Sequence, residues 1–402
     1  MRKKEIRQAC EKDESKIIQS WRKAYPLIFS YKYPNRWRWL YKENPFWESK
    51  NGKLPIWIAI VDDNVVAWNC AMHVNLEISS RVYPAAYSVS TYTLPEFRKQ
   101  GLGFLTQQKN QDSNTIFLSV DMSEGNRRIK KKLGGVEGKP FHIYFKITGK
   151  LDHEKLFKTL LAVCRKYLGN IWLVKASYIR LGFLKQSVGY LMTLLLKNRQ
   201  KQKKLSHHTH YVFKSTRKFG AEVDAFWNLC RQNYSFSVCR DSQYLNWKYV
   251  LQPDLQYLKY LVYDNDKICG ILVYRICKSP ESPIGVICEC LSISANDGNL
   301  IRAMLNFAET DMIKSGAQMY KCGASSRELS NFLEQHGFQK IRTHVPVIYI
   351  DSKLRDINYN EVLKGNWLMS IGDHDMDQFF KHEQPIFPDI VKILLNKIPG
   401  SK

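Results

Sequence analysis

Residues 93–103 read TLPEFRKQGLG, and the fold is most readily inferred from this stretch. The preceding residues, Val82–Leu94, are mostly β-branched, aromatic or small, a composition that predicts a strand. Pro95 should end the pairing of that strand, because proline cannot donate to a ladder. A helix is expected to begin near Phe104. The stretch therefore predicts a strand, a tight turn and a helix in immediate succession.

The turn itself is a predicted pyrophosphate site. Gly101 and Gly103 allow a ligand to approach the backbone closely, and the amides of the turn and of the helix N-terminus point at one spot. Arg98 and Lys99 add positive charge beside it. The dinucleotide-binding fingerprint is excluded, because Thr106 stands where its third glycine would be.

The two halves of the chain share a short sequence motif. Residues 39–45 read WLYKENP and residues 247–253 read WKYVLQP, so both follow the pattern W-x-Y-x-x-x-P. Each is followed by a predicted β-hairpin, with turns at residues 62–64 and 264–266, where Asp and Asn separate apolar, β-branched runs. The repeated order predicts two copies of one α/β unit, against the alternative of two unrelated domains that each need an aromatic anchor.

Composition limits the class of protein. The chain has 402 residues, 44% hydrophobic and 13% aromatic, which excludes extended disorder and favours two domains. Its ten cysteines are scattered singly, which predicts a reducing compartment and no structural metal. The N-terminus is charged and lacks an apolar signal-peptide core, so we expect a cytoplasmic protein.

The positive charge is concentrated in one segment. The net charge is +24, and residues Gly125–Lys204 hold 20 Lys or Arg against three acids. Within this segment, Glu154–Leu168 has the pattern of an amphipathic helix. Two interpretations remain open for the following residues: a helical connector packed between domains, or an interfacial segment resting on anionic lipid at the inner membrane face.

In residues 93–103 and 123–135 the chain resembles the GNAT superfamily of acyl-CoA-dependent N-acyltransferases. Their motif, [Q/R]-x-x-G-x-[G/A], is matched by Arg98, Gly101 and Gly103, and the loop and helix that follow the next strand resemble SEGNRRIKKKLGG at residues 123–135. The resemblance implies an acyl-CoA donor, expected to be acetyl-CoA, and no metal. It assigns the CoA-binding role to Tyr92, Thr93, Leu94, Arg98, Lys99, Gln100, Gly101, Leu102, Gly103 and Asn126.

The catalytic positions depart from the family pattern. The tyrosine that commonly protonates the CoA thiolate falls on Lys130, and the acid often found on the strand falls on Ser90. Asp121 is our first candidate for the general base, with Glu124 as a nearby alternative. Lys130 is the candidate acid, with a solvated surface lysine as the alternative interpretation.

The second half resembles the same superfamily in a degenerate form, similar to two-domain proteins associated with bacterial surface-polysaccharide loci. Its phosphate-loop position, residues 292–305, reads SISANDGNLIRAML, where Asp297 would repel a pyrophosphate. The predicted class is α/β, with two tandem units of mixed, mostly antiparallel sheet flanked by helices. The predicted ranges are an acyl-CoA-binding domain at 1–150, a basic helical connector at 151–205, a degenerate GNAT-like domain at 206–351 and a C-terminal extension at 352–402. We assign no chemistry to NWLMSIGDHDMDQFF in that extension.

The leading functional hypothesis is an N-acetyltransferase acting on a primary amine, such as an amino sugar or another cell-surface glycan precursor. Two alternatives stay open. A Fem-type peptidyltransferase would use aminoacyl-tRNA, which suits the positive charge, although no other nucleic acid is expected as a partner. A CoA-binding, membrane-docked scaffold would have lost catalysis.

The charge of Gly125–Lys204 generates a test of membrane contact. We expect the protein to sediment with anionic vesicles and not with neutral ones, because each basic residue that reaches an anionic surface contributes about 1 kcal/mol. Added salt should release it, since exposed charges are screened within about 10 Å at 0.1 M. Equal pelleting with both lipids, or none with either at low salt, would reject the membrane role.

Overall fold

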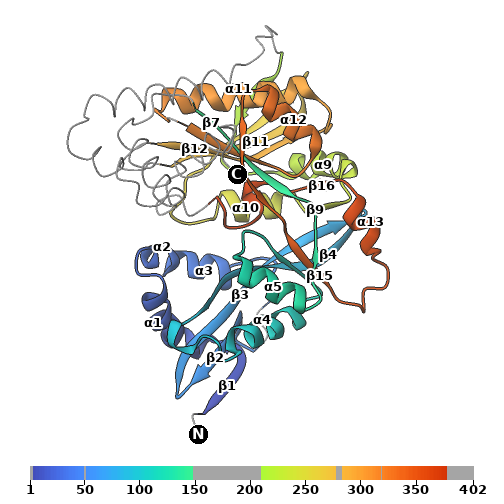
Figure 1. The fold of residues 1–402 in the computed structure, drawn as a ribbon. Coiled ribbons are helices and arrows are strands. Elements are labelled where there is room, and N and C mark those ends of the chain that lie inside the picture. The colour runs from blue at the N-terminus through green and yellow to red at the C-terminus, as the bar shows by residue number, and fades with distance from the viewer. Residues whose placement is uncertain (1–2, 49–50, 148–209, 278–282, 318, 378–402) are drawn as a thin grey trace, which may run out of the picture.

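The computed structural model describes residues 3–48, 51–147, 210–277, 283–317 and 319–377. They form two mixed sheets flanked by helices (Figure 1), as the predicted α/β class requires. The predicted connector at 151–205, with the amphipathic pattern of Glu154–Leu168, lies outside the described residues, as does the chain beyond residue 377. In the part of the chain that the structure describes, no helix has both the length and the apolar character needed to cross a membrane.

The first sheet is antiparallel except where β4 meets β5 and where β9 meets β16. Its main path, in spatial order, is β1 (Lys4–Cys10), β2 (Lys53–Val61), β3 (Asn64–Ile78), β4 (Arg81–Thr93), β5 (Ile116–Ser119), β15 (Val347–Ile350) and β6 (Val136–Glu137). Two short strands, β9 (Phe236–Val238) and β16 (Trp367–Leu368), extend from β3.

The second sheet repeats this arrangement, with one parallel pair between β12 and β13. Its spatial order is β8 (Val212–Ser215), β10 (Leu258–Asp264), β11 (Lys267–Cys277), β12 (Ile284–Ser292), β13 (Met319–Ala324), β7 (Phe141–Ile147) and β14 (Gln339–His344). Read in this direction, each strand corresponds to one in the first sheet, which supports the predicted internal repeat.

The two halves exchange a strand. β7 comes from the first half of the chain but lies between β13 and β14 of the second sheet, whereas β15 comes from the second half and lies between β5 and β6 of the first (Figure 1). The predicted ranges 1–150 and 206–351 therefore describe consecutive stretches of chain, and neither sheet is made from one of them alone.

The local predictions around the hairpins are confirmed. Asp62 and Asp63 have φ of 47° and 66° between β2 and β3, and Asn265 and Asp266 have φ of 46° and 62° between β10 and β11. Asp and Asn tolerate this left-handed region, which two-residue hairpin turns require at both central positions.

Helices cover the sheets. The first half has α1 (Glu14–Ala24), α2 (Phe29–Lys32), α3 (Asn35–Tyr41), α4 (Leu102–Asp112) and α5 (Glu124–Lys132). The second has α9 (Ala221–Cys230), α10 (Ser242–Tyr249), α11 (Gly298–Lys314) and α12 (Arg327–Gln335), followed by α13 (Tyr359–Lys364). α4 packs on β2, β3 and β4, and α11 packs on β11 and β12, so each helix covers the third and fourth strands of its sheet.

The repeated W-x-Y-x-x-x-P motif joins the halves. Trp39 of α3 and Trp247 of α10 stack with ring centroids 4.6 Å apart and planes at 13°. Each indole donates to the other residue's carbonyl, Trp39 Nε1 to Trp247 O at 2.9 Å and Trp247 Nε1 to Trp39 O at 3.4 Å. Because both indoles are buried, these bonds satisfy donors that water cannot reach. The repeat thus supplies a reciprocal contact between halves.

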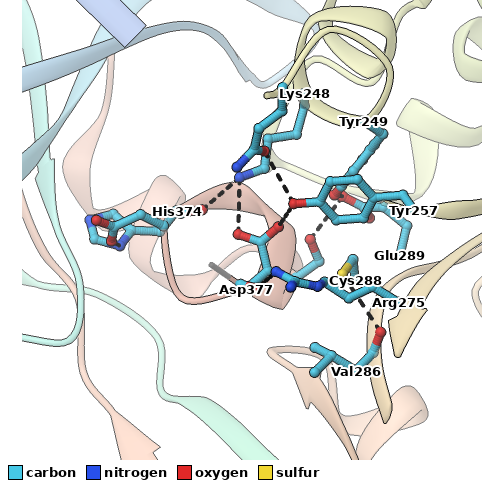
Figure 2. Close-up of polar contacts among 12 residues, drawn as sticks. Lys248, Tyr249, Tyr257, Arg275, Val286, Cys288, Glu289, His374 and Asp377 are labelled. Carbon is cyan, nitrogen blue, oxygen red and sulfur yellow. Dashed lines mark hydrogen bonds and ion pairs between the residues drawn. The ribbon is translucent and has the colours of Figure 1, made fainter. Parts of the chain in front are cut away.

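A buried ionic network holds the segment Ser370–Asp377, which we call the C-terminal segment. Arg240 Nη2 donates to Asp373 Oδ1 at 2.8 Å, and Arg240 Nε donates to Glu289 Oε2 at 3.1 Å. Figure 2 shows the second anchor, where Lys248 Nζ lies 3.1 Å from Asp377 Oδ1 and donates to the His374 carbonyl at 2.9 Å. The side chains of Arg240, Lys248 and Asp377 have no exposed surface.

Breaking this network should destabilise the fold strongly. We expect Arg240→Met to lower the free energy of unfolding by about 3–5 kcal/mol, because Asp373 and Glu289 would remain buried without their cation. Urea denaturation at pH 7 measures this. The matched control is Arg81→Met, which removes an exposed pair with Asp356 and should change the free energy of unfolding far less. Equal losses in the two variants would contradict the prediction.

Candidate functional site

A cleft opens in the first sheet where β4 and β5 part. The two strands pair only at Ala86–Phe117 and Tyr87–Leu118, so in the described residues the rest of β4 is paired with β3 alone. A bulge follows, at which Ser90 has φ of 49°. A cavity of about 460 Å³ lies at this divergence, lined by β4 from Ser88 to Thr91, by residues 119–123 after β5, and by Tyr25, Ile28, Lys32, Gln107, Asn126, Lys130, His374 and Asp375.

The predicted phosphate turn lies at the open end of α4. Gly101 has φ of 77°, a left-handed conformation that favours glycine, and a Cβ added there would meet no atom within 4 Å. Leu105 N donates to Gly101 O at 3.0 Å, so the amides of Leu102, Gly103 and Phe104 belong to the first turn, which has no intrahelical partner. Amides without a partner, next to the open space around Gly101, can bind an anion.

Gly103 serves a different purpose, since it lets α4 approach the end of β4. A Cβ on Gly103 would lie 2.5 Å from Thr93 Oγ1. Thr93 and Tyr92 end β4, and both are partly exposed. Arg98 Nε donates to Thr93 O at 3.2 Å, and its guanidinium lies 5.7 Å from the centre of the Tyr92 ring.

The remaining predicted CoA-binding residues, except Asn126, lie near the same turn. Leu94 N donates to Val66 O at 2.9 Å, which holds the end of β4 against β3. Lys99, with φ of 64°, and Gln100 are exposed, and Leu102 is buried beneath them. Asn126 lies apart from the turn, at the start of α5. Its backbone N–H donates to Ser123 Oγ at 3.3 Å, and the residue lines the cavity.

Lys130 is buried in the wall of the cavity. Its residue is 3% exposed, and no described residue hydrogen-bonds its Nζ, which lies 4.5 Å from the centre of the Phe117 ring. Burial lowers the pKa of Lys130 to about 7. The alternative of a solvated surface lysine is therefore wrong, because α5 turns this residue inward while Lys131 and Lys132 face solvent.

The two candidate general bases, Asp121 and Glu124, differ in their position relative to the cavity. Asp121 lines the cavity, with its side chain 53% exposed and Oδ1 3.3 Å from His344 Nδ1. Glu124 is not among the residues lining the cavity, and its carboxylate pairs with Arg127 at 3.7 Å and Arg128 at 3.3 Å. The structure thus favours Asp121 over Glu124 as a residue of the site.

Sequence reasoning missed three charged residues of the cavity. Lys32 Nζ donates to Ser90 Oγ at 3.0 Å, and burial lowers the pKa of Lys32 to about 8. His374 and Asp375 come from the C-terminal segment, more than 250 residues beyond β4 and β5 in sequence. The signal for them was present in GDHDMD at residues 372–377, where a histidine stands among alternating acids in a basic chain. No comparable signal marks Lys32.

The corresponding cleft of the second sheet is closed. Between β12 and β13 only about 20 Å³ remains, walled in part by Leu368 and Met369. Ser325 Oγ donates to Trp367 O at 2.7 Å and accepts from Met369 N at 2.8 Å, which fastens this chain in place. At α11, the Asp297 carboxylate accepts from the amides of Asn299 and Leu300 at 3.2 and 3.0 Å. These features support the prediction that the second unit does not bind CoA in the usual way.

Lys130 should lower stability in a pH-dependent manner. Its folded pKa lies below the value of a free lysine, so the unfolded chain binds more protons between about pH 7 and 10.5, and stability rises with pH in that window. We expect Lys130→Met to raise the free energy of unfolding at pH 7 by about 1–3 kcal/mol, with the gain shrinking toward pH 10. Urea denaturation at several pH values tests this against Lys131→Met, an exposed neighbour that should change little; a gain independent of pH would refute it.

Among the described residues, no group of three or more histidine, cysteine, aspartate or glutamate side chains is placed to hold a metal ion. A scan against protein-family models finds no match, and a search of curated proteins finds none.

Solved structures, in contrast, share the fold. A GCN5-related N-acetyltransferase from Anabaena variabilis is similar with a TM-score of 0.53 and 11% identity, over 87% of this chain and 73% of that one. One from Kribbella flavida gives 0.52 and 12%, over 87% and 71%. Saccharomyces cerevisiae N-myristoyltransferase with bound myristoyl-CoA gives 0.52 and 11%, over 86% and 82%. The chain therefore has the fold of N-acyltransferases of the GNAT type.

Proposed function

We propose that the protein is an acyl-CoA-dependent N-acyltransferase that transfers an acetyl group to a primary amine. One observation supports this most strongly: the left-handed Gly101, with open space around it, begins α4, whose first amides have no intrahelical partner, beside a cleft where β4 separates from β5. The turn suits the pyrophosphate of CoA, and the edge of β4 near the turn suits the amide groups of its pantetheine arm.

The lining of the cavity supports a short acyl group. Ser88, Ser90, Thr91 and Ser119 contribute hydroxyl groups, and Lys32 and Lys130 contribute amines. A long alkyl chain would desolvate these groups without replacing their hydrogen bonds, which is costly. The cavity therefore favours acetyl over the myristoyl chain found in the yeast neighbour.

Lys130 suits the role of general acid. The thiolate of CoA needs a proton as it leaves, and an ammonium with a pKa of about 7 gives one up readily near neutral pH. Its lack of a competing partner in the described structure leaves the ammonium available for this transfer.

The acceptor we propose is an amino sugar or a related glycan precursor, on the strength of the resemblance to polysaccharide-associated proteins and the polar cavity. We place the reaction on the cytoplasmic side, with the basic segment in peripheral contact with anionic lipid. The open phosphate turn favours acyl-CoA over aminoacyl-tRNA as donor.

A side chain at Gly101 should block the donor. We expect Gly101→Asn to weaken acetyl-CoA binding at least about tenfold in calorimetry, because asparagine tolerates the left-handed backbone while its side chain occupies the space in front of the amides. The matched control is Gly316→Asn, at a position with φ of 78° and equally open surroundings after α11.

Unchanged affinity in a folded Gly101→Asn protein would refute the donor site. Thiol release from acetyl-CoA in the presence of glucosamine and of nucleotide-linked amino sugars tests the acceptor class. Transfer to none of these amines would reject the amino-sugar part of the proposal and leave the donor site standing.

A further inference from the structure

The C-terminal segment brings an acid–base pair into the cavity of the first half. His374 and Asp375 both line it, although the segment is anchored in the second half. Figure 2 shows the His374 imidazole pointing away from Lys248 and Asp377, which hold only its backbone and the end of the segment. Anchors on both sides, at Asp373 and Asp377, fix the position of His374 without using its side chain.

Each nitrogen of His374 faces an acceptor. Nδ1 lies 2.6 Å from Asp375 Oδ1, an ion-pair contact without hydrogen-bond geometry, and Nε2 donates to the Ser88 carbonyl oxygen at 3.3 Å. The other oxygen of Asp375 lies 3.4 Å from Arg36 Nη2, which orients the carboxylate. Ser88 directly follows Tyr87, the last residue of β4 that pairs with β5, so Nε2 meets the cavity where the cleft begins.

Resting on the proposed function, we propose that His374, oriented by Asp375, is the general base that takes the proton of the acceptor amine. In the structure Nε2 donates its proton to the Ser88 carbonyl; loss of that proton gives the base form, with a lone pair on Nε2 at the cavity wall and the Nδ1 proton still beside the Asp375 carboxylate. The amine nitrogen attacks the thioester carbon and forms the N–C bond, Nε2 accepts the amine proton, the C–S bond breaks, and the thiolate takes a proton from Lys130. The amide and free CoA leave, and His374 and Lys130 re-equilibrate their protons with solvent.

Asp121, our candidate from the sequence, is less suited to this role. Its carboxylate is half exposed to solvent and engaged with His344, whereas His374 is buried and oriented by a carboxylate. A base held by a second residue in the wall of a cavity is the arrangement that general-base catalysis needs.

The charged groups around His374 determine its pH dependence. Burial lowers the pKa of His374, while Asp375, the hydrogen bond to the Ser88 carbonyl and, less strongly, Asp121 raise it, and the net shift is upward from 6.5. His344 lies near enough to interact with it. The base form should therefore accumulate as pH rises through a pKa above 6.5.

The first experiment locates the base without an acceptor. Bromoacetyl-CoA carries bromine on the carbon next to its thioester carbonyl, so attack by Nε2 forms an N–C bond at that carbon and expels bromide. We expect peptide mapping to find the adduct on His374, with a labelling rate that rises with pH and falls when CoA competes. An adduct on Asp121 or Lys130 with His374 unmodified, or no adduct while CoA binds, would overturn the assignment.

The second experiment measures acetyl-CoA hydrolysis by thiol release, with water as the acceptor. We expect His374→Ala to lower the rate at least about 100-fold while calorimetric CoA affinity stays unchanged, and added imidazole to restore part of the rate. Asp375→Asn should move the rising limb of the pH profile to lower pH, since the carboxylate that raises the pKa of His374 is lost. His210→Gln, on an exposed histidine, is the control.

The outcomes separate the two proposals. Failure of the wild-type protein to bind CoA would remove the proposed function itself. Normal CoA binding combined with wild-type hydrolysis in His374→Ala, with no rescue by imidazole, or with wild-type hydrolysis no faster than in buffer, would overturn only the role of His374.

Discussion

Two buried cations, Arg240 and Lys248, hold the carboxylates of Asp373 and Asp377 on either side of His374. A charge buried without its partner is costly, so the C-terminal segment has one place in which all four groups are satisfied. Much else follows from that placement. The chain just before the segment closes the cleft of the second sheet, and the segment itself completes the cavity of the first. Residues 368–377 thus close the cleft of the second sheet and line the open cavity of the first.

The strand exchange and a pair of tryptophans connect the two halves of the chain. β7 and β15 each complete the sheet of the other half, and the stacked Trp39 and Trp247 satisfy each other's buried indole donors. The symmetry of the repeat then fails at the helix that follows each cleft. Gly101 leaves the start of α4 open, whereas Asp297 caps the start of α11 with its own carboxylate. A single carboxylate there supplies internally what a bound anion would otherwise provide.

Lys130 shows the energetic cost of a charged group buried in the wall of a cavity. A buried ammonium without a hydrogen-bond partner lowers stability, and an apolar residue of similar shape would fit the contact with Phe117. Residues that a fold retains at such a cost are typical of sites whose chemistry needs them. The same burial that destabilises the charged amine brings its pKa near neutrality, so the energetic penalty and the proposed acid chemistry have one cause.

Local sequence is enough to predict both hairpin turns, the glycine turn between strand and helix, and the repeated tryptophan motif. These depend on the backbone preferences of Asp, Asn and Gly and on patterns among residues close together in the chain. The strand exchange, the burial of Lys130, and the position of His374 and Asp375 in the cavity beside β4 and β5 come from the tertiary structure alone. Those features depend on contacts between residues far apart in the chain, and on buried charges whose partners no local pattern identifies.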